Sequence, residues 1–102
     1  MAQVVSGGMY TIFYITAVKK DLKDLSTEAR QFLDQHFAAL SENPFQGEFL
    51  HGEFRGYFSY HFPHKGTDYR IIYRIVKEEL VVLVIMIGSR KNLYSRLKKR
   101  VR

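Results

Sequence analysis

Two arginines and a tyrosine in the C-terminal half of the chain have the chemistry needed to hold a phosphodiester. Arg70 falls early in one expected strand, Arg90 follows the next expected strand, and Tyr94 comes one helical turn later. If the two strands pair antiparallel, the start of the first lies beside the end of the second. Guanidinium groups bind phosphate oxygens in pairs and stabilise a pentavalent transition state. A phosphate site is therefore expected, the alternative being that Arg70 pairs with Glu48 or Glu53 and Tyr94 packs as an edge residue.

The basic residues are concentrated at the C-terminal end. The formal net charge is +6; residues 1–89 carry nine Lys/Arg against ten Asp/Glu, whereas residues 90–102 carry seven Lys/Arg and no acid. Cations without competing acids can neutralise phosphates and release counterions. The tail therefore indicates a surface for a polyanion, with a solvated helix end as the alternative.

Several classes of chemistry are disfavoured. Without cysteine there is no disulfide, thiolate ligand or thiol nucleophile, and the four histidines, at 36, 51, 61 and 64, have no recognised metal-ligand spacing. Neither GxGxxG nor GxxxxGK[ST] occurs. The longest apolar run, LVVLVIMI at 80–87, is too short to cross a bilayer, and no signal peptide is evident. We expect a cytoplasmic protein with no cofactor, metal or membrane partner.

Periodicity along the chain predicts the scaffold. Residues 10–17 read as a strand, residues 18–25 have apolar residues at helical spacing, and Ser26 can cap a second helix that begins at Thr27 and stops before Pro44. One stripe of that helix is expected to be buried: Ala29, Phe32, Leu33, His36, Phe37 and Leu40.

Strands are expected at 56–62, 68–76 and 80–87, with the last apolar on both faces as in a covered central strand, and a short basic helix in the tail. The fold class is thus α+β, in the order β-α-α-β-β-β-(α), with two N-terminal helices packed on a curved antiparallel sheet. Residues 1–8 are expected to be a flexible leader outside the fold, and residues 9–102 a single domain.

The run DYRIIYRIVKEELVVLVIMIGSRKNLY resembles the C-terminal half of RelE/ParE-superfamily toxins of type II toxin–antitoxin systems. The shared pattern is YR[IL][VI]Y, an acidic turn, an apolar strand, a glycine, a basic residue and a tyrosine. The resemblance implies the fold derived above, a cognate acidic antitoxin in a hetero-oligomer, and a target that is commonly mRNA on the ribosome. It implies metal-independent RNA cleavage in the RelE-like branch, with Arg70, Arg90 and Tyr94 matching family positions. Glu48 falls where YoeB-like toxins have a candidate general base.

Two departures from the family concern proton transfer. Phe58 and Tyr60 stand where active RelE-type enzymes usually have lysines, and the terminal histidine–tyrosine pair of YoeB-like enzymes is absent. Histidine titrates near neutral pH, so His61 or His64 can substitute. His64 lies in a turn, where the alternative is a solvated side chain.

The sequence therefore predicts a RelE-like, ribosome-dependent mRNA endoribonuclease that inhibits translation. Arg70 and Arg90 would hold the phosphate, Tyr94 would position a base or the 2′-OH, and Glu48 or His61 would move the proton. The alternatives are a ParE-like, non-enzymatic inhibitor of DNA gyrase and an inactive RNA-binding relative whose aromatic residues stack bases. The residues expected to contact mRNA or 16S rRNA are Arg74, Lys91, Arg96, Lys98 and Lys99.

Overall fold

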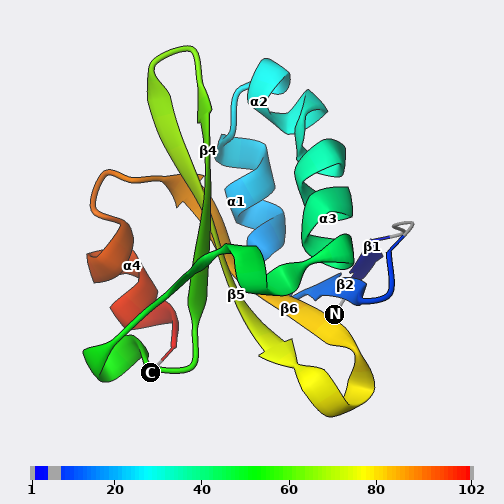
Figure 1. Cartoon of the computed structure of the whole chain (residues 1–102). Helices are drawn as coiled ribbons and strands as arrows, with labels where there is room; N and C mark the ends of the chain where they lie inside the picture. The colour runs from blue at the N-terminus through cyan, green and yellow to red at the C-terminus, as the bar shows by residue number, and fades with distance from the viewer. Residues whose placement is uncertain (1, 5–7, 102) are drawn as a thin grey trace.

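The computed structural model describes residues 2–4 and 8–101, which form a six-stranded sheet with helices on both faces (Figure 1). The elements are, in chain order, β1 (Ala2–Val4), β2 (Thr11–Tyr14), α1 (Val18–Asp24), α2 (Thr27–Gln31), α3 (Leu33–Glu42), η1 (Pro44–Gln46), β3 (Glu48–Phe49), η2 (Gly52–Phe54), β4 (Phe58–His64), β5 (Thr67–Val76), η3 (Lys77–Glu79), β6 (Val81–Ser89) and α4 (Leu93–Arg100). The strand order is β1-β2-β6-β5-β4-β3. The α+β class and the order of the elements are as expected from the sequence.

The expectation of a wholly antiparallel sheet is wrong for one pair of strands. β2 runs parallel to β6, whereas all the other neighbouring strands are antiparallel. Tight turns set the direction of β4, β5 and β6, but helices and two hairpins separate β2 from β6. No local turn therefore fixes their relative direction, and it is decided by how the helices return the chain to the sheet.

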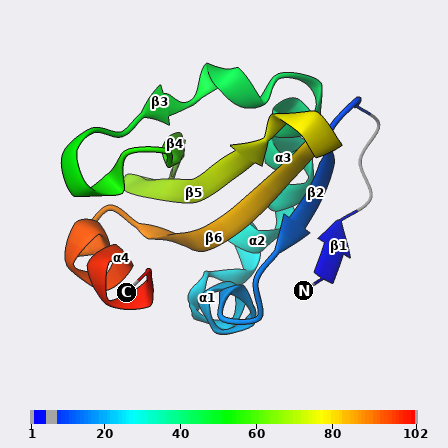
Figure 2. The same ribbon diagram turned by 90° about the horizontal axis from the view of Figure 1, so that it is seen from below.

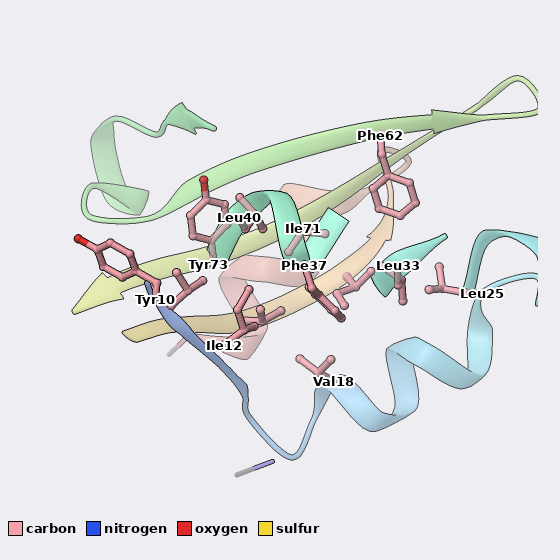
Figure 3. Packing of buried hydrophobic residues seen from close by; sticks show 13 residues of the cluster. Tyr10, Ile12, Val18, Leu25, Leu33, Phe37, Leu40, Phe62, Ile71 and Tyr73 are labelled. Carbon is pink, nitrogen blue, oxygen red and sulfur yellow. The ribbon is translucent and has the colours of Figure 1, made fainter. Parts of the chain in front are cut away.

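The first core lies between one face of the sheet and the N-terminal helices (Figure 3). Ser26 caps α2 by accepting a hydrogen bond from the Ala29 backbone N–H at 3.1 Å, as the sequence indicated. The buried residues of this core come from α1, α3 and four strands, and include Val18, Leu33, Phe37, Leu40, Ile12, Phe62, Ile71 and Tyr73. The helical stripe predicted from the sequence thus covers the sheet with residues 29, 33, 37 and 40.

The expectation that Phe32 is buried in that stripe is wrong. The predicted single helix is divided at this residue, which ends α2 and precedes α3, and the Phe32 side chain is 40% exposed. Its ring lies 5.1 Å from the ring of His64 in the β4–β5 hairpin. His36, one turn later, is half-buried against Tyr60 and Phe62. Both residues therefore flank the stripe and contact the hairpin.

A second core covers the opposite face of the sheet, where α4 packs (Figure 1). Leu93 and Leu97 of α4 meet Ile72 and Met86 of the sheet and Phe54 of η2. The sheet register shifts between Ile72 and Tyr73, which pair with Met86 and Val84. The skipped residue, Ile85, is a β-bulge in β6. β6 therefore has buried side chains on both faces, as its continuous apolar sequence predicted.

The N-terminal segment is a further correction. Residues 1–8 were expected to lie outside the fold, but Ala2–Val4 form an edge strand antiparallel to β2. Gly8 packs so closely on the backbone of Ser41 that a side chain there would collide with it. Residues 1 and 5–7 lie outside the described part of the chain, so the prediction of flexibility is untested for them.

A buried ion pair joins the basic tail to the first helix, where α1 and α4 approach beside β6 (Figure 2). Arg100 donates to both carboxylate oxygens of Asp21, with Nη1–Oδ2 at 2.5 Å and Nη2–Oδ1 at 3.0 Å. Asp21 also accepts the Ile87 N–H at 3.0 Å, and Arg100 Nη1 donates to the Ile85 carbonyl at 3.1 Å. These two backbone groups lie past the end of β2, where no strand pairs with β6. The side chains of the ion pair therefore supply the hydrogen-bond partners that a neighbouring strand would otherwise provide.

Candidate active site

Arg70 lies on the sheet face that carries α4, with only 15% of its side chain exposed. Its Nη2 donates to Asp68 Oδ2 at 3.1 Å. Its Nη1 is held more loosely, at 3.5 Å from Ser59 Oγ and 4.0 Å from Glu48 Oε1. The alternative considered from the sequence was that Arg70 pairs with Glu48 or Glu53. Arg70 does lie near Glu48, but Glu53 pairs with Lys98 at 3.9 Å.

His61 lies directly across the sheet from Arg70, since the two residues are register partners in β4 and β5. Its Nδ1 is 3.2 Å from Asp68 Oδ1, and 61% of its side chain is exposed. The hydrogen bond from Arg70, with a smaller contribution from His61, holds the pKa of the Asp68 carboxyl below its usual value. Asp68 is therefore a carboxylate at neutral pH.

The Arg90 segment reaches the same point through the backbone. The pairing of β5 with β6 sets Arg70 opposite Gly88 and Tyr69 opposite Ser89. One residue further on, the Arg90 N–H donates to the Asp68 carbonyl at 2.7 Å. The side chain of Arg90 is exposed. The two strand ends are thus neighbours, as antiparallel pairing predicted, while the role of each arginine stays a prediction.

Glu48, His61 and Ser59 share an open hollow of about 460 Å³ with Gln46, Gly47 and Tyr60. Packing requires a glycine at position 47, because a Cβ there would collide with the hydroxyl of Tyr73. Glu48 is exposed beside Arg70, and its role as a general base stays a prediction. The hollow leaves room for a ligand next to His61 and Ser59.

Two other predicted residues lie elsewhere. The Tyr94 ring stacks on Phe54, with centroids 5.8 Å apart, and within residues 2–4 and 8–101 no hydrogen bond joins it to Arg70. His64 belongs with Phe58, Tyr60 and Phe62 on the opposite side of β4 and lies 3.4 Å from Glu28. Side chains alternate along a strand, so His64 lies on the helix face of the sheet, away from Arg70, where its ring contacts Phe32.

The residues expected to bind RNA are all exposed: Arg74, Lys91, Arg96, Lys98 and Lys99. Three of them also have structural contacts. Arg74 lies over the ring of Tyr57 at 5.5 Å, Arg96 donates to the Ser89 carbonyl at 3.0 Å, and Lys98 pairs with Glu53. The aromatic residues considered for base stacking are Tyr57, Phe58 and Tyr60. All three are half-buried, Phe58 and Tyr60 against the first core and Tyr57 against the second.

Sequence reasoning missed Asp68, although a signal for it was present. Residues 68 and 70 are two apart in a strand and must face the same way. Ser59 faces Arg70 for the same reason, on the neighbouring strand. Neither residue belongs to the motif that drew attention to Arg70, and so neither was considered.

Within residues 2–4 and 8–101 there is no cluster of three potential metal ligands and no helix with the length and apolar character of a membrane span.

Comparisons with known proteins agree with this fold. A model of the ParE-like toxin family of type II bacterial toxin–antitoxin systems matches residues 12–98. The RelBE2 toxin–antitoxin complex from Mycobacterium tuberculosis is similar at 31% identity and a TM-score of 0.68, over 79% of this chain and 98% of that one. A double-mutant RelE toxin from E. coli in the free state has 21% identity and a TM-score of 0.71, over 92% and 99%. The toxin of the intact E. coli RelBE complex has 22% identity and a TM-score of 0.64, over 78% and 94%. No curated protein sequence matches.

The fold and these matches define a toxin of a type II toxin–antitoxin system, with a RelE-like architecture. The chain belongs to the ParE-like toxin family, within the RelE/ParE superfamily.

Proposed function

We propose that this toxin is a RelE-like, ribosome-dependent mRNA endoribonuclease that acts in the cytoplasm and inhibits translation. The observation that carries the proposal is the hydrogen-bonded set of His61, Asp68 and Arg70 beside an open hollow. It combines a cation that can bind phosphate with an imidazole that can accept a proton. Those two functions suffice for metal-independent attack of a 2′-OH on the adjacent phosphate.

Arg70 supports this proposal through its loosely held nitrogen. Nη2 is committed to Asp68, but the contacts of Nη1 with Ser59 and Glu48 are long. A phosphate oxygen can take that position without breaking the ion pair. The exposed side chain of Arg90, whose backbone is bonded to Asp68, supplies a second cation at the same edge.

The same proposal includes the partners. An acidic antitoxin would form a hetero-oligomer with this chain, by analogy with the antitoxin complexes of its RelE-like relatives. The exposed cations of α4 and Arg74 would contact mRNA and 16S rRNA, because tail residues 90–102 contain no acid to compete with phosphate.

A non-enzymatic gyrase inhibitor is the second candidate, and one observation favours it. Arg70 is flanked by two carboxylates, Asp68 and Glu48, so much of its charge is already neutralised. A purely structural arginine would have this environment. The family model that matches the chain is also ParE-like.

Mapping mRNA 5′ ends after induction in a bacterial host tests the proposal. The chain should produce cuts in frame with codons, and the variant Arg70→Ala/Arg90→Ala should lose them while still folding. Lys19→Ala/Arg30→Ala is the matched control, since it removes the same charge from exposed positions on α1 and α2. Growth arrest without cuts, unchanged in Arg70→Ala/Arg90→Ala, would refute the nuclease and support gyrase inhibition. Neither arrest nor cuts would indicate an inactive relative.

A further inference from the structure

Asp68 contacts three of the predicted residues at the Arg70 end of the sheet. Its Oδ1 is 3.2 Å from His61 Nδ1, and its Oδ2 accepts from Arg70 Nη2 at 3.1 Å. Its backbone carbonyl accepts from the Arg90 N–H at 2.7 Å. One residue thus sets the relative positions of an imidazole, a guanidinium and the segment that carries the second cation.

The contact with Asp68 determines which ring nitrogen of neutral His61 is protonated. An ionised carboxylate can only accept hydrogen bonds, so Nδ1 must be the donor in this pair. The lone pair of the neutral ring is then on Nε2. Since 61% of the side chain is exposed, Nε2 can be reached by a substrate.

Glu48 is the competing candidate for the base, and its position is less determined. It is 70% exposed on its side chain and reaches Arg70 only at 4.0 Å, whereas His61 is held by a hydrogen bond and faces Arg70 across the strand pair. A catalytic base must be held at the reacting proton. The better-held group is His61.

We infer that His61 Nε2 is the general base of the RNA cleavage and that Asp68 is the positioning residue that fixes its tautomer and ties it to Arg70. This inference rests on the proposed nuclease function. The 2′-OH gives its proton to Nε2 as the O2′–P bond forms and the P–O5′ bond breaks. Water donates a proton to the leaving 5′ oxygen, and the products are a 2′,3′-cyclic phosphate and a 5′-hydroxyl.

A mutant cycle measured by single-turnover cleavage of mRNA on programmed ribosomes tests the inference. His61→Ala should slow cleavage by about 100-fold or more, and Asp68→Asn by a similar factor, because an asparagine amide can hold the wrong tautomer. In the His61→Ala background, Asp68→Asn should have almost no further effect. Imidazole in the buffer should partly restore His61→Ala, and His51→Gln and Asp34→Asn, both exposed and outside the proposed site, should cleave like the wild type.

Three results would overturn it: an unchanged rate in Asp68→Asn, an equal loss from Asp68→Asn with and without His61, or normal cleavage by His61→Ala. The pH–rate profile is a second readout. The charged groups that face His61 are Asp68, Arg70 and Glu48, so Glu48→Gln should keep the pH dependence of the wild-type rate, while His61→Ala should lose it.

The tautomer is measurable without activity. Nitrogen-15 NMR of the imidazole should find Nδ1 protonated in the wild type at a pH where the ring is neutral, and a changed tautomer ratio in Asp68→Asn. If the wild type does not cut ribosome-bound mRNA, the nuclease function fails and the catalytic role fails with it. In that case, a changed tautomer ratio in Asp68→Asn would still show that Asp68 orients the His61 ring. An unchanged ratio would refute the orienting role of Asp68 too.

Discussion

The Asp21–Arg100 ion pair should contribute strongly to stability, and Asp21→Asn is the substitution that tests it. The change removes a carboxylate charge from a side chain that is 6% exposed, opposite a guanidinium that is 19% exposed. Breaking a buried pair by removing one partner destabilises by roughly 3–5 kcal/mol. Because Arg100 keeps some access to water and asparagine can still accept the Ile87 N–H, we expect a loss of about 2–3 kcal/mol.

That loss can be measured by urea denaturation and by calorimetry. At about 4 °C per kcal/mol for a chain of this length, the midpoint of thermal unfolding should fall by roughly 8–12 °C. Asp24→Asn is the matched control, since it removes the same charge from an exposed position on the same helix. It should change the free energy of unfolding by about 0.5 kcal/mol or less.

A double variant separates the ion pair from other effects of the substitution. In Asp21→Asn/Arg100→Gln the unpaired charge is gone, so the combined loss should be smaller than the sum of the single losses. A loss below about 1 kcal/mol in Asp21→Asn, or one equal to that of Asp24→Asn, would refute the assignment of the pair as a buried link between α1, α4 and β6.

Two further predictions concern the helices that cover the sheet. Phe37→Ala should lower the free energy of unfolding by about 3–5 kcal/mol in urea denaturation, whereas Phe32→Ala, at a 40% exposed position, should lower it by about 1 kcal/mol or less; equal losses would contradict the division of the helix. Burial lowers the pKa of His36 below 6.5, so the unfolded chain takes up its proton first as the pH falls. The free energy of unfolding should therefore decrease as the pH falls below 6.5. The decrease should be smaller in His36→Gln than in the exposed control His51→Gln. Equal pH dependence of the two variants in urea titrations would show that His36 is not responsible.

Much of the fold could be predicted because its elements have local signals. Ser26 and the apolar stripe define a helix, the two-residue alternation defines β4 and β5, and the continuous apolar run of β6 indicates burial on both faces. The side-chain alternation also brings Arg70 and His61 to one face. These properties follow from backbone geometry alone, because the 3.6-residue period of a helix and the 2-residue period of a strand are visible in the spacing of apolar residues along the sequence.

What the sequence determined by itself is therefore the set of elements, the covered central strand, the basic C-terminal helix and the family to which the chain belongs. Only the tertiary structure decided that β2 runs parallel to β6 and that Phe32 faces the hairpin. It alone made Asp68 the link between His61, Arg70 and Arg90, and it turned Arg100 from a tail cation into the partner of Asp21. Such contacts join residues far apart in the chain, and they depend on packing directions that no local periodicity specifies.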